Sequence, residues 1–428
     1  MAASNIFIMY QISRLKDNLA VVTAEMPHMA SISLGVWVGI GGRYEPAPLN
    51  GISHFIEHML FKGTRRRTAR QISQAVEGIG GYLNAFTSEE ISCFYSKARH
   101  DRFEELLEVL MDMYLNSAFE RVEIEKERGV IKEELAMYLD QPHQHVQELL
   151  SETLWPNHAL GRTLTGTEKT IGSIGRAELL SYQRANYTSA TTLVAAAGNL
   201  SHENVVKAVA RFARYFASGK RPCFEPVNDD QRAPRLRLLA RDNSQTQLAM
   251  AFRTCSRHDE RRFALRLLNA LLGENMSSRL FQALREDHGL AYSIQSSLSS
   301  FDDVGSLTIS AGLEAVNLPY ALKLTARELR RFKEISPGAT ELRYARDYLI
   351  GQIELGLEST ENQMMWMGEH MLAYGKILAP SEIKKRIAEV KPAQIRKVAR
   401  DFFQPERLSL ALVSPLKSDT GLLSCLKL

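Results

Sequence analysis

Two histidines and a glutamate lie within one short segment of the sequence, the run Gly-Ile-Ser-His-Phe-Ile-Glu-His that ends at His58. His54 and His58 are four residues apart, so on a helix their side chains lie one above the other on a single face. Neutral imidazoles are common zinc ligands, and two on one face suit one ion. Glu57 projects beside them, near enough to take a proton from a metal-bound water. We therefore interpret Glu57 as a general base and not as a ligand.

A catalytic zinc site needs a third protein ligand, and an acidic segment downstream offers Glu127, Glu133 and Glu134. Glu127 and Glu134 are about two helical turns apart and share a face, so one could bind the metal while the other supports it. On spacing alone the alternative is a solvated charged face stabilised by Lys126 and Lys132. The histidine pair, taken alone, is also compatible with ordinary surface or core histidines.

The pattern around these residues predicts short helices between strands. The apolar-rich segment 52–61 has helical character, follows a glycine-rich strand end and is broken by Lys62-Gly63-Thr64, so the histidine motif is predicted on a short helix. The other predicted elements of this half are strands at 10–13, 19–24, 30–39, 82–98 and 191–197, and helices at 69–79, 101–115, 120–139, 176–186 and 201–215.

The second half repeats this order of elements. A proline-rich and polar stretch over 218–234 is predicted as an exposed linker. After it come strands at 236–241 and 245–252, helices, a strand pair at 291–298 and 304–312, and helices from 318 to 403. The repeated order of strands and helices predicts a duplicated α+β unit. We therefore expect two homologous domains, residues 1–217 and 235–428, each a mainly antiparallel sheet packed with helices.

Composition excludes several classes of protein. The chain of 428 residues is 45% hydrophobic and 24% charged with a net charge of +4, which is typical of a soluble globular protein and lacks the basic footprint of nucleic-acid binding. Its four cysteines show no CxxC spacing, which argues against a zinc ribbon or a disulfide framework. No stretch approaches the roughly 20 apolar residues that span a membrane. Residues 1–10 lack the features of a signal peptide and are expected to belong to the mature protein. We predict a cytoplasmic location.

The order His-x-x-Glu-His is the inverzincin signature, and the sequence around it resembles the pitrilysin and insulin-degrading-enzyme peptidases. The resemblance is strongest to their short branch, which includes mitochondrial processing peptidase and bacterial zinc peptidases. The matching segments occur in both halves, in the family order, and cover nearly the whole chain. They are His54 to Thr64, Asn84 to Thr87, Glu127 with 130–134, Ser277 to Phe281, Arg285 with Glu286, and Gly289 to Ser293. The resemblance implies a LuxS/MPP-like metallohydrolase fold.

The resemblance also implies a role for each residue of the metal constellation. Its implied ligands, for one Zn²⁺ per chain, are His54, His58 and Glu134. Glu57 is implied to be the base, and Glu127 a supporting carboxylate behind the ligands. Glu133 is excluded, because one residue of helix turns it about 100° away from the face of Glu134.

The same resemblance implies how a peptide is held. Asn84, Ala85 and Phe86 are implied to lie on an exposed edge strand, to which an extended substrate adds by main-chain hydrogen bonds. Arg285 and Tyr292 are implied to contact the substrate or the oxyanion at the scissile carbonyl, although residue type alone is compatible with a surface arginine and a core tyrosine. In some short-branch enzymes the metal motif and the Arg/Tyr pair are on different subunits, whereas this chain has both. We therefore expect a homodimer, with a chain that closes its own halves as the alternative.

These interpretations predict a zinc-dependent endopeptidase or oligopeptidase for unfolded or short peptides. One alternative is a non-catalytic structural subunit, similar to the respiratory-chain core proteins, and the intact metal constellation argues against it. The other is a processing peptidase for basic presequences. It lacks support because no transit peptide is recognised and because the region before Ser277 has one glycine, Gly273, in place of a glycine-rich loop.

Overall fold

The computed structural model describes residues 10–228 and 231–428, and these form two compact units. The first unit contains the described residues up to Leu135, Thr163–Glu225 and Leu355–Leu378, and the second contains Ala136–Arg162, Pro226–Glu354 and Ala379–Leu428. Each unit has one sheet packed with helices, which confirms the predicted α+β class. Most of the N-terminal segment expected to belong to the mature protein, residues 1–9, lies outside the described residues.

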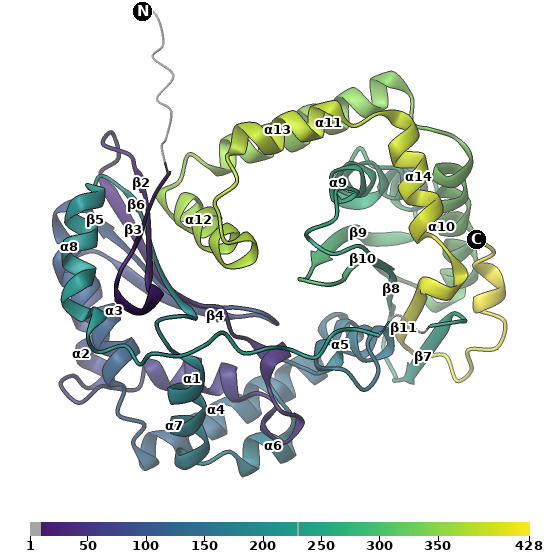
Figure 1. Ribbon diagram of the computed structural model, residues 1–428. Coiled ribbons are helices and arrows are strands. Elements are labelled where there is room, and N and C mark those ends of the chain that lie inside the picture. The colour runs from purple at the N-terminus through teal and green to yellow at the C-terminus, as the bar shows by residue number, and fades with distance from the viewer. Residues whose placement is uncertain (1–9, 229–230) are drawn as a thin grey trace, which may run out of the picture. The chain divides into compact units, whose positions relative to one another are not determined.

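The sheet of the first unit has the strand order β1-β2-β6-β3-β5-β4 (Figure 1). Its strands are β1 (Tyr10–Arg14), β2 (Ala20–Glu25), β3 (Ser31–Val38), β4 (Tyr82–Thr87), β5 (Ser92–Arg99) and β6 (Thr192–Gly198). All neighbours are antiparallel except β2 and β6, which are parallel. Strand β4 is at the edge and pairs with β5 alone, so the backbone groups on its other side are open to a further strand.

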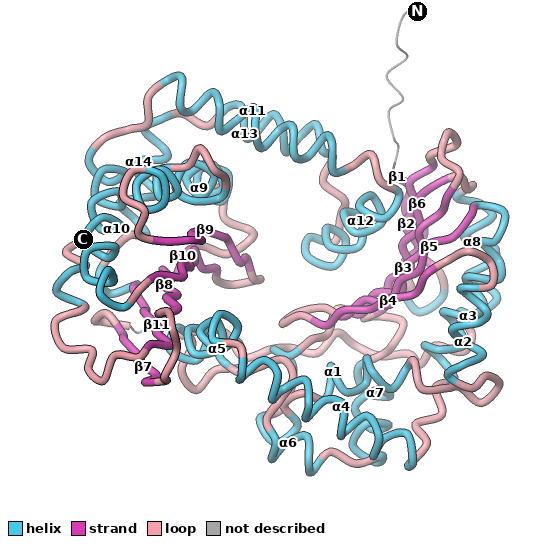
Figure 2. Tube along the Cα trace, turned by 180° about the vertical axis from the view of Figure 1, so that it is seen from behind, coloured by secondary structure: helices cyan, strands magenta, loops and turns pink. Residues whose placement is uncertain are grey.

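Helices cover both faces of this sheet (Figure 2). The helices of this unit are α1 (Ile52–Leu60), α2 (Ala69–Glu77), α3 (Phe103–Asn116), α4 (Arg121–Asp140), α6 (Glu168–Ser173), α7 (Arg176–Asn186), α8 (His202–Ala213) and α12 (Thr360–Tyr374), of which α4 continues into the second unit. Along β6, Val194 belongs to a large core that includes residues of α1 and α3, whereas Leu193 and Ala195 pack with Met364 of α12. Burial on both faces explains why β6 is apolar from Leu193 to Ala197.

The sheet of the second unit has the order β7-β11-β8-β10-β9. Its strands are β7 (Arg235–Ala240), β8 (Thr246–Thr254), β9 (Ala291–Ser300), β10 (Gly305–Leu313) and β11 (Leu408–Ser414). Its helices are α5 (Pro142–Leu154), α9 (Arg262–Asn269), α10 (Leu318–Glu334), α11 (Ala339–Gly356), α13 (Pro380–Glu389) and α14 (Pro392–Phe402). Only β7 and β11 are parallel. The order repeats that of the first sheet without β1, in agreement with the predicted duplication.

Two helices depart from the predicted division into residues 1–217 and 235–428. Helix α5 comes from the first half of the chain, yet its Leu150 packs with Ala249 and Ala411 of the second sheet. Helix α12 comes from the second half and packs on the first sheet. Each sheet thus has an apolar face that is covered by a helix from the other half of the sequence, α12 on the first sheet and α5 on the second. The units also separate between Glu225 and Pro226, within the predicted linker.

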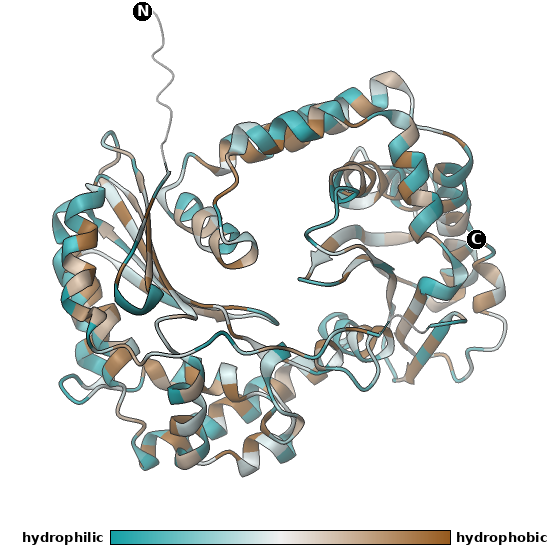
Figure 3. Ribbon diagram, viewed as in Figure 1, coloured by the Kyte–Doolittle hydropathy of each residue, from teal (hydrophilic) through white to brown (hydrophobic). Residues whose placement is uncertain are grey.

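The helices that flank the two sheets show alternating hydrophobic and hydrophilic bands along their length (Figure 3). Such amphipathic helices bury one face and leave the other to water. Within residues 10–228 and 231–428, no helix combines the length and the apolar character that crossing a bilayer requires. Cys93, Cys223, Cys255 and Cys425 are free thiols.

The docking of α12 depends on a glycine. A Cβ atom at Gly368 would lie 2.1 Å from Cε2 of the buried Trp37, so only glycine lets the helix approach the sheet this closely. Gly351, in α11, has no heavy atom within 4 Å of the corresponding position. These two helical glycines therefore form a matched pair for a test of packing.

We expect Gly368→Ala to lower the free energy of unfolding by about 1–3 kcal/mol, because the added methyl group overpacks the Trp37 contact. Gly351→Ala should leave stability unchanged or raise it by about 0.5–1 kcal/mol, through helix propensity alone. Urea denaturation followed by tryptophan fluorescence measures both changes. Equal unfolding midpoints for the two variants would contradict the close packing of α12.

Candidate metal centre

Helix α1 is fixed so that the histidine motif lies on its less buried face. Phe55, Ile56 and Met59 are buried in the core, whereas His54 and His58 are partly exposed. The helix begins after Gly51, whose φ of 92° favours glycine. The buried carboxylate of Glu45 accepts hydrogen bonds from the backbone N–H groups of Gly51 at 2.7 Å and Ser53 at 2.8 Å, which satisfies free donors of the first turn.

Helix α4 brings a carboxylate to both histidines. Oε2 of Glu134 lies 3.7 Å from Nε2 of His54 and 3.6 Å from Nε2 of His58. The two imidazole rings have centroids 4.5 Å apart. One ligand atom from each of the three residues falls within 4.8 Å of the others, and no other such cluster of His, Cys, Asp or Glu is found in the described parts of the chain. Glu133 is exposed.

This cluster fits a zinc ion. Two ligand atoms bound to one tetrahedral zinc at about 2.1 Å lie about 3.4 Å apart, close to the two separations observed between imidazole and carboxylate. Burial and the neighbouring His58 lower the pKa of His54 to about 4, so its imidazole is neutral near pH 7 and need not lose a proton to bind metal. Two neutral imidazoles and one carboxylate are a known catalytic zinc set that leaves a position for water.

Behind the cluster, Glu127 links His58 to Lys62. Its Oε2 lies 3.1 Å from Nδ1 of His58, and its Oε1 forms an ion pair with Nζ of Lys62 at 2.8 Å. The carboxylate is buried, so the lysine supplies the charge that balances it. A carboxylate on Nδ1 keeps the proton on that nitrogen and leaves the Nε2 lone pair toward Glu134.

The remaining motif residue, Glu57, is oriented by strand β4. The hydroxyl of Thr87, at the end of β4, donates a hydrogen bond to Oε2 of Glu57. Burial raises the pKa of the Glu57 carboxyl, and the Thr87 hydrogen bond and His58 oppose this rise. The side chain is thus held in one orientation beside the cluster, with Oε1 free of the Thr87 bond.

The three residues expected on an edge strand lie on β4, which is at the edge of its sheet. Asn84 is exposed, and its Oδ1 accepts a hydrogen bond from the backbone N–H of Ala85 at 2.8 Å. The Phe86 ring makes an edge contact with Trp37, with centroids 5.7 Å apart. Phe86 therefore anchors the strand to Trp37. The side chain of Asn84 holds the backbone N–H of Ala85, a donor that an added strand would use.

Arg285 and Tyr292 come together within the second unit. Arg285 lies in a one-turn π-helical segment, Phe281–Glu286, of the kind often found at functional positions. Tyr292, on β9, is 81% exposed, so the core position that residue type alone allowed is not what the structure shows. The guanidinium carbon of Arg285 lies 5.6 Å from the centre of the Tyr292 ring, within reach of a cation–π interaction.

Sequence reasoning did not assign roles to Thr87, Lys62 or Glu45. Both Thr87 and Lys62 belong to segments that carry the family resemblance, Asn84 to Thr87 and His54 to Thr64. Their side-chain partners, however, are distant in sequence, and no spacing rule points to them. Glu45 precedes α1 by seven residues, too far for a usual helix cap.

Comparison with known proteins identifies the family. Residues 20–168 match the family described as Insulinase (Peptidase family M16), and residues 173–349 match the one described as Peptidase M16 inactive domain. A relative from Bacillus subtilis, named uncharacterized zinc protease YmxG, is 37% identical over 401 residues, which are 94% of this chain and 97% of the relative. An uncharacterized zinc protease of Streptomyces coelicolor is 36% identical over 94% of this chain and 89% of its own length.

Two solved structures share the fold. A protease from Helicobacter pylori gives a TM-score of 0.89 at 20% identity, covering 95% of this chain and all of that one (100%). A Pseudomonas fluorescens structure, described as a peptidase M16 inactive domain, gives 0.88 at 18% identity, covering 96% and 99% of the two chains. The fold likeness thus extends over both units. The histidine motif lies in the first family match, and the Arg285 and Tyr292 pair lies in the second.

We expect Lys62→Met to weaken zinc binding about tenfold, because Glu127 then lacks its cation and holds His58 less firmly. Lys126→Met is the matched control, since Lys126 pairs with Glu123 at 2.6 Å on the outer face of α4. Competition with a chromophoric chelator measures the affinity of each variant. Unchanged zinc affinity in Lys62→Met, or an equal loss in both variants, would remove Lys62 from the support of the site.

Proposed function

Because the chain belongs to the insulinase family, peptidase family M16, we propose that it is a zinc-dependent endopeptidase or oligopeptidase for unfolded or short peptides. The observation that carries this proposal is the convergence of three ligand atoms from His54, His58 and Glu134 within 4.8 Å. A partly buried glutamate, Glu57, lies on the same helix as the two histidines. Together these residues have the composition of a hydrolytic zinc site.

In the proposed mechanism His54, His58 and Glu134 would hold the ion, which would lower the pKa of a bound water to about 7 and polarise the scissile carbonyl. Glu57 accepts the proton of the attacking water and then transfers it to the leaving amine. The Thr87 hydroxyl holds one carboxylate oxygen, so the other is the one that takes the proton.

Substrate is proposed to bind along β4 as an added strand. Main-chain hydrogen bonds to an edge strand recognise an extended backbone and tolerate many side chains, which suits unfolded or short peptides. The donor at Ala85 is held by Asn84 in the free protein, and the side chain of Asn84 turns aside when a peptide carbonyl takes its place. Arg285 and Tyr292 are proposed to contact the substrate or stabilise the anion at the scissile carbonyl.

Assembly as a homodimer and a cytoplasmic location stay predictions. The first rests on the presence of the metal motif and the Arg/Tyr pair in one chain, and the second on composition. Sedimentation at micromolar concentration measures the mass in solution, and a mass of one chain would contradict the dimer. Cell fractionation measures the compartment.

The decisive test of the proposed function is Glu57→Gln. We expect zinc content to remain and cleavage of a quenched peptide pool to fall by at least about 10²–10⁴-fold, because the amide cannot accept the proton. Glu133→Gln is the matched control, since Glu133 is exposed one residue from Glu134, and it should retain activity. Equal activity of wild type and Glu57→Gln would exclude this base. Absence of zinc from the wild type would favour a structural subunit.

A second test concerns the second unit. Tyr292→Phe removes one hydroxyl from an exposed ring, so we expect slower turnover by about 10–10³-fold with zinc retained, as for loss of one donor to an oxyanion. Tyr344→Phe removes the hydroxyl of another exposed tyrosine, on α11, and should not change turnover. Steady-state kinetics and metal analysis provide the two readouts. Loss of metal from Tyr292→Phe would contradict the role proposed for this residue.

A further inference from the structure

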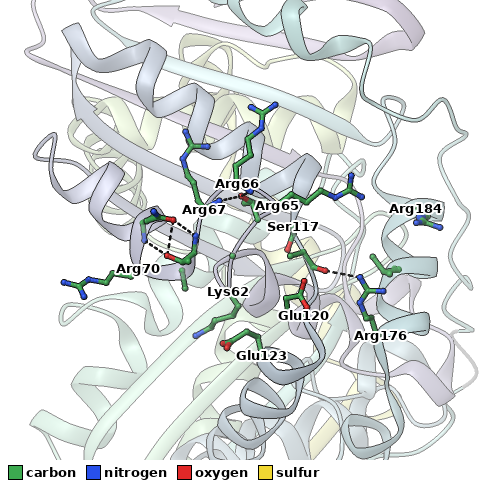
Figure 4. A pocket seen from close by; sticks show the side chains of 17 residues that line it. Lys62, Arg65, Arg66, Arg67, Arg70, Ser117, Glu120, Glu123, Arg176 and Arg184 are labelled. Carbon is green, nitrogen blue, oxygen red and sulfur yellow. Dashed lines mark hydrogen bonds between the residues drawn. The ribbon is translucent and has the colours of Figure 1, made fainter.

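A basic cavity of about 750 Å³ lies in the first unit, separate from the cluster of metal-ligand residues (Figure 4). Its walls are the loop after α1, the start of α2, the start of α4 and helix α7. Seven basic side chains line it, against two acidic ones. They are Lys62, Arg65, Arg66, Arg67, Arg70, Arg176 and Arg184, against Glu120 and Glu123. The whole chain has a net charge of only +4, so this excess is strongly local.

The arginine-bearing loop is held rigidly by hydrogen bonds. The Thr64 hydroxyl donates to Asp112 at 2.7 Å and accepts from the backbone N–H groups of Arg66 at 3.0 Å and Arg67 at 2.9 Å. The backbone N–H of Arg65 is bonded to the carbonyl of Asn116 at 3.1 Å. The loop therefore presents its side chains from a fixed backbone, which reduces the entropy lost when a ligand binds.

Helix α7 supplies the opposite wall through one row of side chains. Arg176, Leu180 and Arg184 are spaced by four residues and so lie along one ridge of the helix. The guanidinium of Arg176 is fixed by the carbonyls of Phe119 and Ala118, at 2.8 and 3.2 Å. In the view of Figure 4, Arg65 extends toward the side on which Arg176 and Arg184 lie, whereas Arg70 points the other way.

Two of the seven cations are neutralised by acids outside the cavity. Arg67 pairs with Asp112 at 2.7 Å, and Lys62 pairs with Glu127. In contrast, the side chains of Arg65, Arg66, Arg70 and Arg184 make no hydrogen bond or ion pair with any other described residue. The carbonyl partners of Arg176 leave its charge in place. Of the two acids, Glu123 is already paired with Lys126, so the cavity retains an excess of uncompensated positive charge.

We propose that this cavity binds a small multivalent oxyanion, a metabolite with two or more phosphate or carboxylate groups, between Arg65 on the loop and Arg184 on α7. Guanidinium groups bind the oxygens of phosphate and carboxylate through paired hydrogen bonds. Charged groups on two walls suit a ligand with more than one anionic centre. The volume is within the range of pockets for small molecules, and Leu180 and Ala118 offer apolar contact to a carbon frame.

The test is isothermal titration calorimetry on the zinc-loaded protein near physiological ionic strength, with two probes. Fructose 1,6-bisphosphate represents phosphates and tricarballylate represents carboxylates, and both chelate zinc less strongly than polyphosphate or citrate. We expect saturable binding of at least one probe, and the stronger one identifies the preferred group. Arg65→Gln combined with Arg184→Gln should weaken it by about tenfold or more, because charge-assisted hydrogen bonds are lost from both walls. Zinc content is measured after each titration to confirm that the probe leaves the metal in place.

A charge-matched control separates a built site from general attraction. Arg232→Ser combined with Lys417→Ser also removes two positive charges, at exposed positions outside the cavity, and should leave the affinity within about twofold. An equal loss in both double variants, or an unchanged affinity in the cavity variant, overturns the proposal. So does the absence of probe binding at millimolar concentration. Binding of a polyglutamate peptide alone, lost in the cavity variant, would assign the surface to an acidic protein partner instead.

Discussion

The hydrogen bond between His58 and Glu127 is the contact on which the candidate site depends most directly. The histidine pair comes from α1, and its carboxylate partners come from α4, about seventy residues later in the sequence. Glu127 lies at the crossing of these two helices, with His58 on one side and Lys62 on the other. Because Glu127 is buried, loss of Lys62 would leave an uncompensated charge in a poorly solvated place, and loss of His58 would leave one carboxylate oxygen without its partner. The contact that orients the His58 imidazole therefore also fixes α1 relative to α4. Glu134 reaches the Nε2 atoms of both histidines only when the two helices are held in this position.

The scaffold supports this crossing by burying the sheet on both faces. In the first unit, α1 and α3 share the larger core, while α12 covers the other face through methionines and the close contact of Gly368 with Trp37. Phe86 packs its ring on the same Trp37. The edge strand proposed to receive substrate is thus anchored to the core through one aromatic contact, and its last residue, Thr87, fixes Glu57. The packing of the sheet on α12 and the orientation of Glu57 are thus linked through two adjacent residues of β4, Phe86 and Thr87.

Patterns that are local in sequence predicted much of this architecture, and relations between distant segments account for what they missed. The helix at 52–61 and the amphipathic helices at 101–115 and 120–139 correspond closely to α1, α3 and α4, because periodicity and breakers are properties of adjacent residues. The predictions did not include α5, which directly follows α4 after one bend, or β11, a short apolar run near the C-terminus. Helices α5 and α12 each pack on the sheet formed by the other half of the sequence, and nothing in their own patterns names that sheet. In the candidate site, sequence spacing alone left open which of Glu127 and Glu134 binds the metal and which supports it. Only the way α1 and α4 meet places Glu127 at Nδ1 of His58 and Glu134 at Nε2.

Comparison of the two units distinguishes the features that come with the fold from those that a metal site needs in addition. Both sheets end in an edge strand after the same sequence of pairings, β4 in the first and β9 in the second. Most residues proposed to contact substrate lie on these corresponding strands, Asn84 to Phe86 on β4 and Tyr292 on β9. The three residues proposed as metal ligands belong to the first unit alone. An edge strand follows from the topology of the sheet and is repeated whenever the sheet is repeated. A metal site follows from a few side chains on helices that cross in one register, so the duplicated fold can keep the substrate-facing edge in both units and the chemistry in one.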